Sequence, residues 1–283
     1  MAAAISLRDD TFAPASPAAY HLYAVAGASR LRLAVLEAER QKVVALDDLP
    51  YGGPATLPAL AATHELLRQP GWARVRVALT GRAFTLLPAP LFRVGDEAAY
   101  LQLHHPLAAT EEALAYPLPL PPPGTDVVSL FAADRQLATW LAGTYGPAGR
   151  LLPQPVALLA GLLRQRGPAP LARQLCLCLT DQELAVLVPG PQVEFCNVFR
   201  VTTAEDVVYY TILVMQELGL NPDQDAVTLW GDLTRDSHTF EALSTYVRHL
   251  RLGERPFGLN YSYQLNELPA HQYFDLFSLP SAV

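Results

Sequence analysis

The chain alternates between short apolar runs and polar turns, and this pattern occurs twice in nearly the same order. In each half, three apolar runs precede a segment with helical periodicity, and a fourth apolar run follows it. The predicted strands are 19–26, 30–36, 42–46 and 72–80 in the first half and 173–179, 183–188, 193–199 and 225–230 in the second. The spacing from the first to the fourth strand is nearly equal in the two halves, which favours a duplicated unit.

Helices complete each repeated unit. We expect them at 57–68 and 97–104 in the first half and at 204–218 and 240–249 in the second. The helix 204–218 has the clearest limits, because Thr203 and Asp206 are suited to cap its start and Gly219 follows its last apolar residue. Three meandering strands followed by a helical crossover to a parallel strand give a mixed sheet. The prediction is an α/β fold of two strand-strand-strand-helix-strand-helix units, with mixed sheets flanked by helices.

Proline clusters indicate where the chain divides. Prolines 147, 153, 155, 168 and 170 lie near the middle, and proline continues neither helices nor central strands. We therefore expect two domains, residues 1–150 as the first half and residues 151–283 as the second half with an aromatic tail. The segment 116–124, YPLPLPPPG, predicts a polyproline II connector. A proline-rich ligand for an adaptor domain is the alternative, but the segment lacks flanking basic residues.

The last thirty residues carry a dense set of aromatic rings, which a free tail would not need to hold. These rings are Phe257, Tyr261, Tyr263, Tyr273, Phe274 and Phe277. We expect them to be buried against the body of the same chain. Pro269 is expected to open a short helix that places Tyr273 and Phe277 on one face.

Composition narrows the function classes. The 283 residues are 51% hydrophobic with a net charge of -7, and no basic cluster offers the electrostatic surface that binding to a phosphate backbone needs. Nucleic acid is therefore not an expected partner. The start of the chain lacks the pattern of a secretory signal, and the most apolar helical stretch, 156–163, is far shorter than the roughly 20 residues that span a bilayer. We expect no membrane span and a cytoplasmic location.

Few residues are suited to catalysis or metal binding. Cys176 and Cys178 alternate with leucines on a predicted strand, which favours buried strand cysteines over a metal site with Cys196. Lys42 is the only lysine and follows no glycine-rich loop, so an ordinary phosphate-loop nucleoside triphosphatase is excluded. We assign no catalytic residue and no metal ligand.

The order of elements resembles the superfamily of actin, heat-shock proteins and sugar kinases, which has a ribonuclease H-like two-domain architecture. Among its members are the actin-like scaffold proteins of pilus and secretion machines. The stretch 197–220 and the tail 268–277 also resemble a bacterial domain-of-unknown-function family, numbered 3822. That resemblance implies no activity, and it marks Asn197, Glu205, Asp206, Tyr209, Tyr210 and His271. Our interpretation of these positions is a helix entrance, a buried aromatic face and a docked tail.

The superfamily resemblance implies where a nucleotide would bind. Its ATP-binding members hold phosphates at the turn after the first strand of each half and adenosine at two adjacent glycines after the last strand. Here the turn 25–29 has no acid, the turn 180–183 has Asp181 but no glycine, and Gly231 is followed by Asp232. Asp181, Gly231 and Asp232 are thus the candidate residues of a degenerate nucleotide cleft. We expect no cofactor and no binding of ATP.

Three functions are compatible with this sequence. The first is a non-catalytic actin-like scaffold or protein-interaction module that binds a protein partner. The second is a divergent ATP-binding phosphotransferase or ATPase, which Asp181 favours. The third is a regulatory module that binds a small ligand between the halves, where clefts between domains commonly hold ligands.

Overall fold

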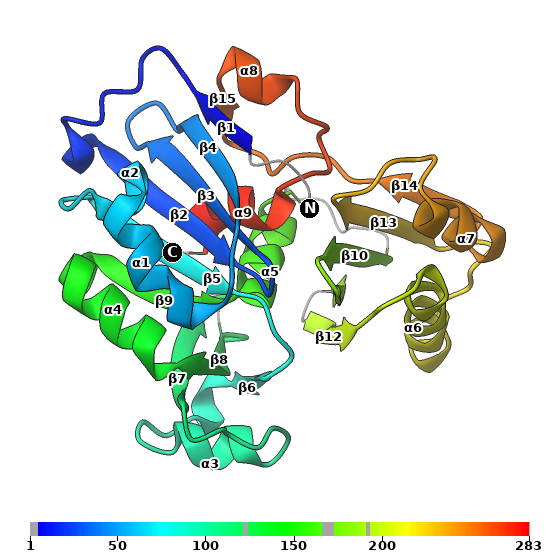
Figure 1. The fold of residues 1–283 in the computed structure, drawn as a ribbon. Coiled ribbons are helices and arrows are strands. Elements are labelled where there is room, and N and C mark those ends of the chain that lie inside the picture. The colour runs from blue at the N-terminus through cyan, green and yellow to red at the C-terminus, as the bar shows by residue number, and fades with distance from the viewer. Residues whose placement is uncertain (1–4, 121–123, 166–172, 191–192, 283) are drawn as a thin grey trace.

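The structure is a computed structural model that describes residues 5–120, 124–165, 173–190 and 193–282. Two large β-sheets lie on either side of a helical layer, and a smaller sheet extends from the first half (Figure 1). None of the helices in those ranges is long and apolar enough to cross a membrane.

The first sheet has seven strands in the order β1-β4-β3-β2-β5-β9, with β15 added beside β4. Strands β2, β3 and β4 form an antiparallel meander, and β5 and β9 extend it in parallel. The strands are β1 (Ile5–Arg8), β2 (Tyr20–Ala26), β3 (Arg30–Glu37), β4 (Lys42–Pro50), β5 (Arg74–Leu79), β9 (Gly149–Pro153) and β15 (Asn260–Tyr261).

The second sheet repeats this arrangement in five strands. Its order, β12-β11-β10-β13-β14, and its strand directions match β4-β3-β2-β5-β9 of the first sheet. The strands are β10 (Gln174–Thr180), β11 (Glu183–Pro189), β12 (Val193–Arg200), β13 (Ala226–Gly231) and β14 (His249–Leu252). The predicted duplication and the predicted α/β class are confirmed.

Helices cover the sheets in layers. Helices α1, α2 and α4 lie on one face of the first sheet, α5 and α9 lie between the two sheets, and α6 and α7 cover the outer face of the second sheet (Figure 1). The α-helices are α1 (Leu57–Thr63), α2 (Glu65–Arg68), α3 (Glu97–Gln102), α4 (Arg135–Tyr145), α5 (Gln154–Gln165), α6 (Ala204–Glu217), α7 (His238–Tyr246), α8 (Tyr263–Asn266) and α9 (Phe274–Ser278). Short 3-10 helices occupy Pro17–Ala19, Pro54–Thr56, Ala89–Leu91, Gly146–Ala148 and Leu279–Ser281.

A three-stranded sheet, absent from our prediction, is inserted between β5 and β9. Its order is β6-β8-β7, and α3 packs against it. Its strands are β6 (Phe84–Pro88), β7 (Glu111–Leu118) and β8 (Val127–Asp134). The polyproline prediction is wrong for residues 116–118, because they pair with β8 as part of β7. The prolines at 121–123 lie outside the described residues.

Two predicted helices differ from the observed ones. The helix expected at 57–68 is interrupted at His64, whose backbone is extended and whose ring nitrogen lies 3.3 Å from an Asp47 carboxylate oxygen. A tertiary contact thus overrides local helix propensity. The helix expected at 240–249 ends at Tyr246, because Val247 turns extended and residues 249–252 pair with β13 as β14.

Helix α6 begins as expected. The Thr203 side chain accepts from the Asp206 backbone N–H, and the Asp206 carboxylate accepts from the Thr203 backbone N–H, which together form a capping box. Acidic residues in this first turn also interact favourably with the helix dipole.

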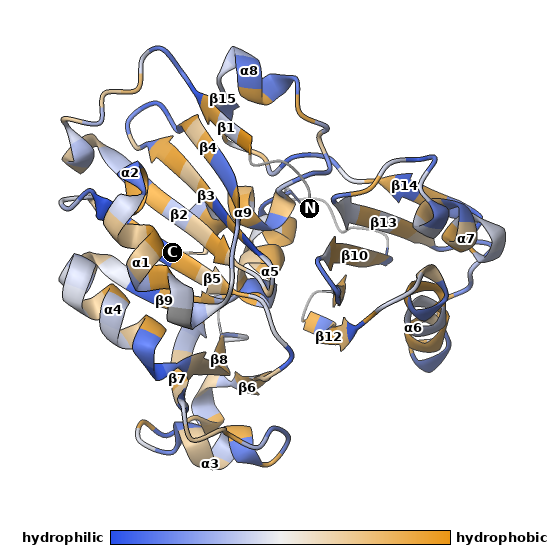
Figure 2. Cartoon of the chain, in the orientation of Figure 1, coloured by the Kyte–Doolittle hydropathy of each residue, from blue (hydrophilic) through white to orange (hydrophobic). Residues whose placement is uncertain are grey.

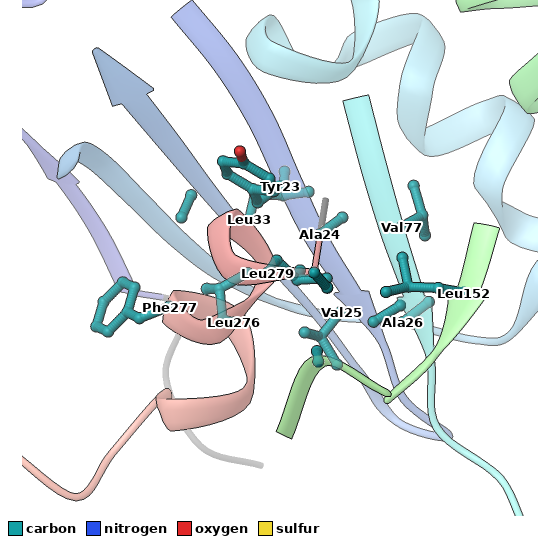
Figure 3. Close-up of a cluster of buried hydrophobic side chains, with 14 of the residues drawn as sticks. Tyr23, Ala24, Val25, Ala26, Leu33, Val77, Leu152, Leu276, Phe277 and Leu279 are labelled. Carbon is teal, nitrogen blue, oxygen red and sulfur yellow. The ribbon is translucent and has the colours of Figure 1, made fainter. Parts of the chain in front are cut away.

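The core is built from strands that are apolar along most of their length (Figure 2). In the first sheet, Val25 and Leu33 are fully buried because helices cover both faces. Helix α9 contributes Leu276 and Phe277 to this core, beside β2 and β3, and the 3-10 helix that follows α9 contributes Leu279 (Figure 3). Burying one such side chain contributes about 2 kcal/mol.

The tail prediction is confirmed in part. Tyr273, Phe274 and Phe277 are buried, and Phe274 lies 4.5 Å, centroid to centroid, from the Trp230 ring of the second half. The helix starts after Tyr273 rather than at Pro269, since the residues between them form turns. The burial prediction is wrong for Phe257 and Tyr263, which are exposed.

Candidate nucleotide cleft

A cavity of about 690 Å³ lies where the two halves meet. Turns and strand ends of both halves line it, together with the segment that leads into α9. The lining residues are Ser29, Arg30, Arg32, Asp48, Pro50, Tyr51, Gly52, Leu179, Thr180, Asp181, Asp232, Gln272 and Tyr273. Two of the predicted site residues, Asp181 and Asp232, therefore lie in one cavity.

Asp181 joins the two equivalent turns of the duplicated unit. Its carboxylate accepts hydrogen bonds from the Ser29 backbone N–H at 3.2 Å and the Ser29 hydroxyl at 3.0 Å. A Cβ on Gly27 would lie 2.5 Å from an Asp181 carboxylate oxygen, so a larger residue there would displace the Asp181 side chain. Asp181 itself adopts a left-handed conformation with φ of 52°, which Asp tolerates better than most residues. Asp181, a candidate residue of the predicted nucleotide cleft, thus binds the opposite turn.

Gly231, the third predicted site residue, does not line the cavity but precedes Asp232, which does. Its packing explains why the position is glycine. A Cβ at this position would lie 2.2 Å from the Leu179 carbonyl oxygen, and its φ is 133°. Its backbone N–H donates to the His271 carbonyl at 3.0 Å. The Gln272 amide donates to the Asp232 carboxylate at 3.1 Å. The turn that would hold adenosine is thus bonded to the chain's own tail.

Arg30 and Asp48 form an ion pair on the first-half wall of the cavity. The Arg30 guanidinium donates to Asp48 at 2.7 Å, and the Tyr273 hydroxyl donates to the other Asp48 oxygen at 3.1 Å. Burial, and then the Asp48 charge, raise the pKa of Tyr273 above its ordinary value, so this hydroxyl stays protonated as a donor. Burial likewise raises the pKa of Tyr51 to about 12.

A buried polar network connects the first sheet, the tail and the second half. Arg32 binds Asp275 of α9 with two nitrogens, at 2.8 and 3.3 Å, and Asp275 is 1% exposed. The Gln154 amide of α5 donates both to Asp275 and to the Thr180 hydroxyl. Burial by itself lowers the pKa of Arg32, but Asp275 and the other nearby acidic groups, Asp48 and Asp181 among them, together outweigh it and raise that pKa above its ordinary value.

The charges of the cavity are unfavourable for a polyphosphate. Asp48, Asp181 and Asp232 contribute three carboxylates, whereas the cations Arg30 and Arg32 are already bound to carboxylates. A nucleotide triphosphate would meet net repulsion there. The cavity is better matched to a neutral or cationic polar ligand.

The described residues contain no group of three His, Cys, Asp or Glu side chains placed to hold a metal ion. The cysteines illustrate why, since Cys176 pairs across with Leu187 and Leu187 pairs with Cys196. Two strand spacings, about 10 Å, therefore separate Cys176 from Cys196. A single metal ion cannot bridge this distance.

Half of this cleft was not predicted from the sequence. Arg30 and Arg32 lie in the predicted strand 30–36, and Asp48 lies just beyond the predicted strand 42–46, in the part of β4 that the prediction leaves out. Charged residues at alternating positions of a buried strand indicate a polar site. Asp275, an acidic residue among the aromatic residues of the tail, likewise indicates a buried polar site.

The family-marking positions are spread over two regions. Asp206 caps α6, Tyr210 stacks on Phe199 with ring centroids 4.3 Å apart, and the buried His271 ring contacts the Leu233 carbonyl. Asp206 and His271 agree with our interpretation, whereas Tyr210 packs against the core but is only partly buried. Tyr209 does not agree with it, because 62% of it is exposed on α6. The Asn197 side chain accepts from the backbone N–H of the next residue on β12.

The duplicated sheets and the cleft between them define a protein of the actin-like ATPase fold. A crystal structure from Bacteroides thetaiotaomicron, described as having an actin-like ATPase fold and unknown function, superposes with a TM-score of 0.74 at 16% identity, covering 86% of this chain and 94% of that one. The PilM–PilN type IV pilus biogenesis complex matches with a TM-score of 0.59 at 17% identity, covering 94% of this chain and 100% of that one. At these identities the matches establish the fold alone.

The chain belongs to the family described as protein of unknown function DUF3822, whose model matches residues 9–250. A comparison with curated protein sequences finds no match.

Proposed function

We propose that this protein is a non-catalytic actin-like scaffold, or protein-interaction module, with a degenerate nucleotide cleft. The observation that carries the proposal is the pair of hydrogen bonds between Asp181 and Ser29, which span the place where the two phosphate-binding turns would receive a nucleotide. The bonds from the tail to Gly231 and Asp232 support the same conclusion at the adenosine turn.

A protein partner is part of this proposal. The similar fold of PilM, solved in a complex with PilN, supports the idea that an actin-like chain of this size can serve to bind another protein. A cytoplasmic location belongs to the proposal as well, since Cys178 and Cys196 are free thiols of the kind that reducing compartments preserve.

The test is a thermal melt with and without Mg-ATP. At about a hundred times a micromolar dissociation constant, a true ligand would add roughly 2.7 kcal/mol of stability. We expect the melting temperature to stay unchanged. An upward shift that disappears in Asp181→Asn would overturn the scaffold assignment and favour the ATPase alternative.

The cavity favours one second candidate, a regulatory module that binds a small ligand. Its volume of about 690 Å³ lies within the range of small-molecule sites. Its carboxylates and the Tyr51 and Tyr273 rings suit a cationic or neutral polar compound. A thermal-shift screen of such compounds tests this candidate: a shift that Asp232→Asn removes would support it, and no shift across the screen would reject it.

A further inference from the structure

The outer face of the second half carries an apolar groove between α6 and α7, with a volume of about 520 Å³. Its lining residues are Glu205, Val208, Tyr209, Ile212, Leu213, Gln216, Ala242, Thr245 and Tyr246. Two large rings border it in an exposed state, Tyr209 at 62% and Tyr246 at 59%. Exposed tyrosine rings provide a large and rigid contact area for a partner. Contiguous exposed apolar surface of this kind marks interaction sites.

The acidic and basic residues within the two helices that line the groove have one sign of charge. Helices α6 and α7 together contain the acids Glu205, Asp206, Glu217 and Glu241 and neither lysine nor arginine. Arg235, which precedes α7, lies over the Phe240 ring, 5.9 Å from its centroid. A partner segment with basic residues beside its apolar ones is therefore electrostatically complementary to this surface.

The backbone geometry indicates which kind of segment fits. Every lining residue belongs to a helix, so no sheet edge lies in the groove to pair with an extended strand. A helix satisfies its own backbone hydrogen bonds and needs only side-chain contacts, as in other helix-in-groove complexes. Residues 205–216 of α6 extend for about 17 Å at the usual rise per residue, which matches a helix of roughly three turns.

We propose that the α6–α7 groove binds an amphipathic helix of a partner protein, with lysine or arginine beside its apolar face. This proposal rests on the proposed interaction function and names its surface. Tyr209 and Tyr246 are the anchors of the contact. The acidic residues of the two helices orient the partner helix and make its binding depend on salt concentration.

A phage-displayed library of helical peptides, roughly 14 residues long, selected on the full-length protein, tests the proposal. We expect the recovered peptides to carry apolar residues at i, i+3, i+4 and i+7 and to be enriched in lysine and arginine. Fluorescence anisotropy with a recovered peptide should show at least a tenfold loss of affinity in Tyr209→Ala and in Tyr246→Ala. Raising the salt concentration should also weaken binding.

Tyr263→Ala is the matched control, because Tyr263 is 80% exposed and lies outside the groove. It should leave peptide affinity unchanged, and melting curves should show that all three variants fold. Recovery of no peptide, of acidic peptides, or of peptides unaffected by Tyr209→Ala and Tyr246→Ala would overturn the groove assignment. That result would leave the scaffold function standing as long as Mg-ATP fails to stabilise the protein. Stabilisation by Mg-ATP would instead reject the scaffold function, whatever the peptides do.

Discussion

The Asp181 carboxylate of the second half hydrogen bonds to Ser29 of the first half, so the two turns that are equivalent by duplication contact one another. The superfamily resemblance implies that these are the turns at which a nucleotide's phosphates would bind. Here the Asp181 carboxylate and the Ser29 hydroxyl bind each other. This exposed contact therefore helps to fix the orientation of the two halves.

This contact predicts a measurable coupling between Asp181 and Ser29. Urea denaturation of Ser29→Ala, Asp181→Ala and the double variant should give an interaction energy of about 0.5–1 kcal/mol, modest because the bonds are exposed to water. The same cycle between Ser29→Ala and Asp232→Ala should give an interaction energy near zero. Equal coupling in both cycles would mean that the effect is not specific to the contact.

The Arg32–Asp275 pair predicts a much larger effect. Both side chains are almost fully enclosed, and the pair joins β3 to α9. Asp275→Ala should cost about 3–5 kcal/mol of unfolding free energy, because it leaves a buried guanidinium without its carboxylate. The double variant Arg32→Met, Asp275→Leu should recover most of this loss, since it removes both charges. A single variant that costs less than about 1 kcal/mol would show that water reaches Arg32.

The order of the strands along the chain was predictable from the sequence, because each of these strands is an apolar run bounded by turns. The β6-β8-β7 insertion was not, since β7 contains Pro117 and its last residues belong to the segment 116–124, whose prolines indicate a polyproline connector. The break at His64 depends on Asp47, a residue distant in sequence. Of the cleft, Asp181 and Asp232 were predictable from turn position, whereas Arg32 and Asp275 lie 243 residues apart and meet only through the fold.

Asp47 makes stability depend on pH in the acidic range. Burial by itself raises the pKa of Asp47, but hydrogen bonds from His64 and from Arg8 outweigh it and lower the pKa from 3.8 to about 2. A carboxyl whose pKa is lower in the folded state stabilises the fold above its unfolded pKa and loses this contribution as pH falls through the folded value. The window is therefore about pH 4 to pH 2.

The measurement is urea denaturation of the wild type and Asp47→Asn at several pH values between 5 and 2. The stability advantage of the wild type should be constant near pH 5 and should shrink steadily below pH 4. An advantage that does not change across the window would mean that Asp47 does not titrate with a lowered pKa.

Removal of the tail should destabilise the whole protein. Truncation after Gly253 deletes β15, α8 and α9 and with them the buried side chains of Phe274, Leu276 and Phe277. Each contributes about 2 kcal/mol through burial, and total stability is only about 5–15 kcal/mol. We expect the shortened chain to aggregate or to melt far below the full-length protein. A truncated chain that melts like the full-length one would contradict a core role for the tail.

A pair of glycine substitutions tests the packing of the tail without deleting it. Gly161 of α5 faces α9, and a Cβ there would lie 2.0 Å from the Ser278 hydroxyl oxygen and 2.6 Å from its Cβ. Gly161→Ala should destabilise the protein by about 1–3 kcal/mol through overpacking, even though alanine is the better helix former. Gly143 of α4 has nothing within 4 Å of the equivalent position, so Gly143→Ala should instead stabilise by about 0.5–1 kcal/mol. Opposite signs in thermal melts would locate the constraint at the α5–α9 contact. Stabilisation by both substitutions would show that α9 can move away from α5 at little cost.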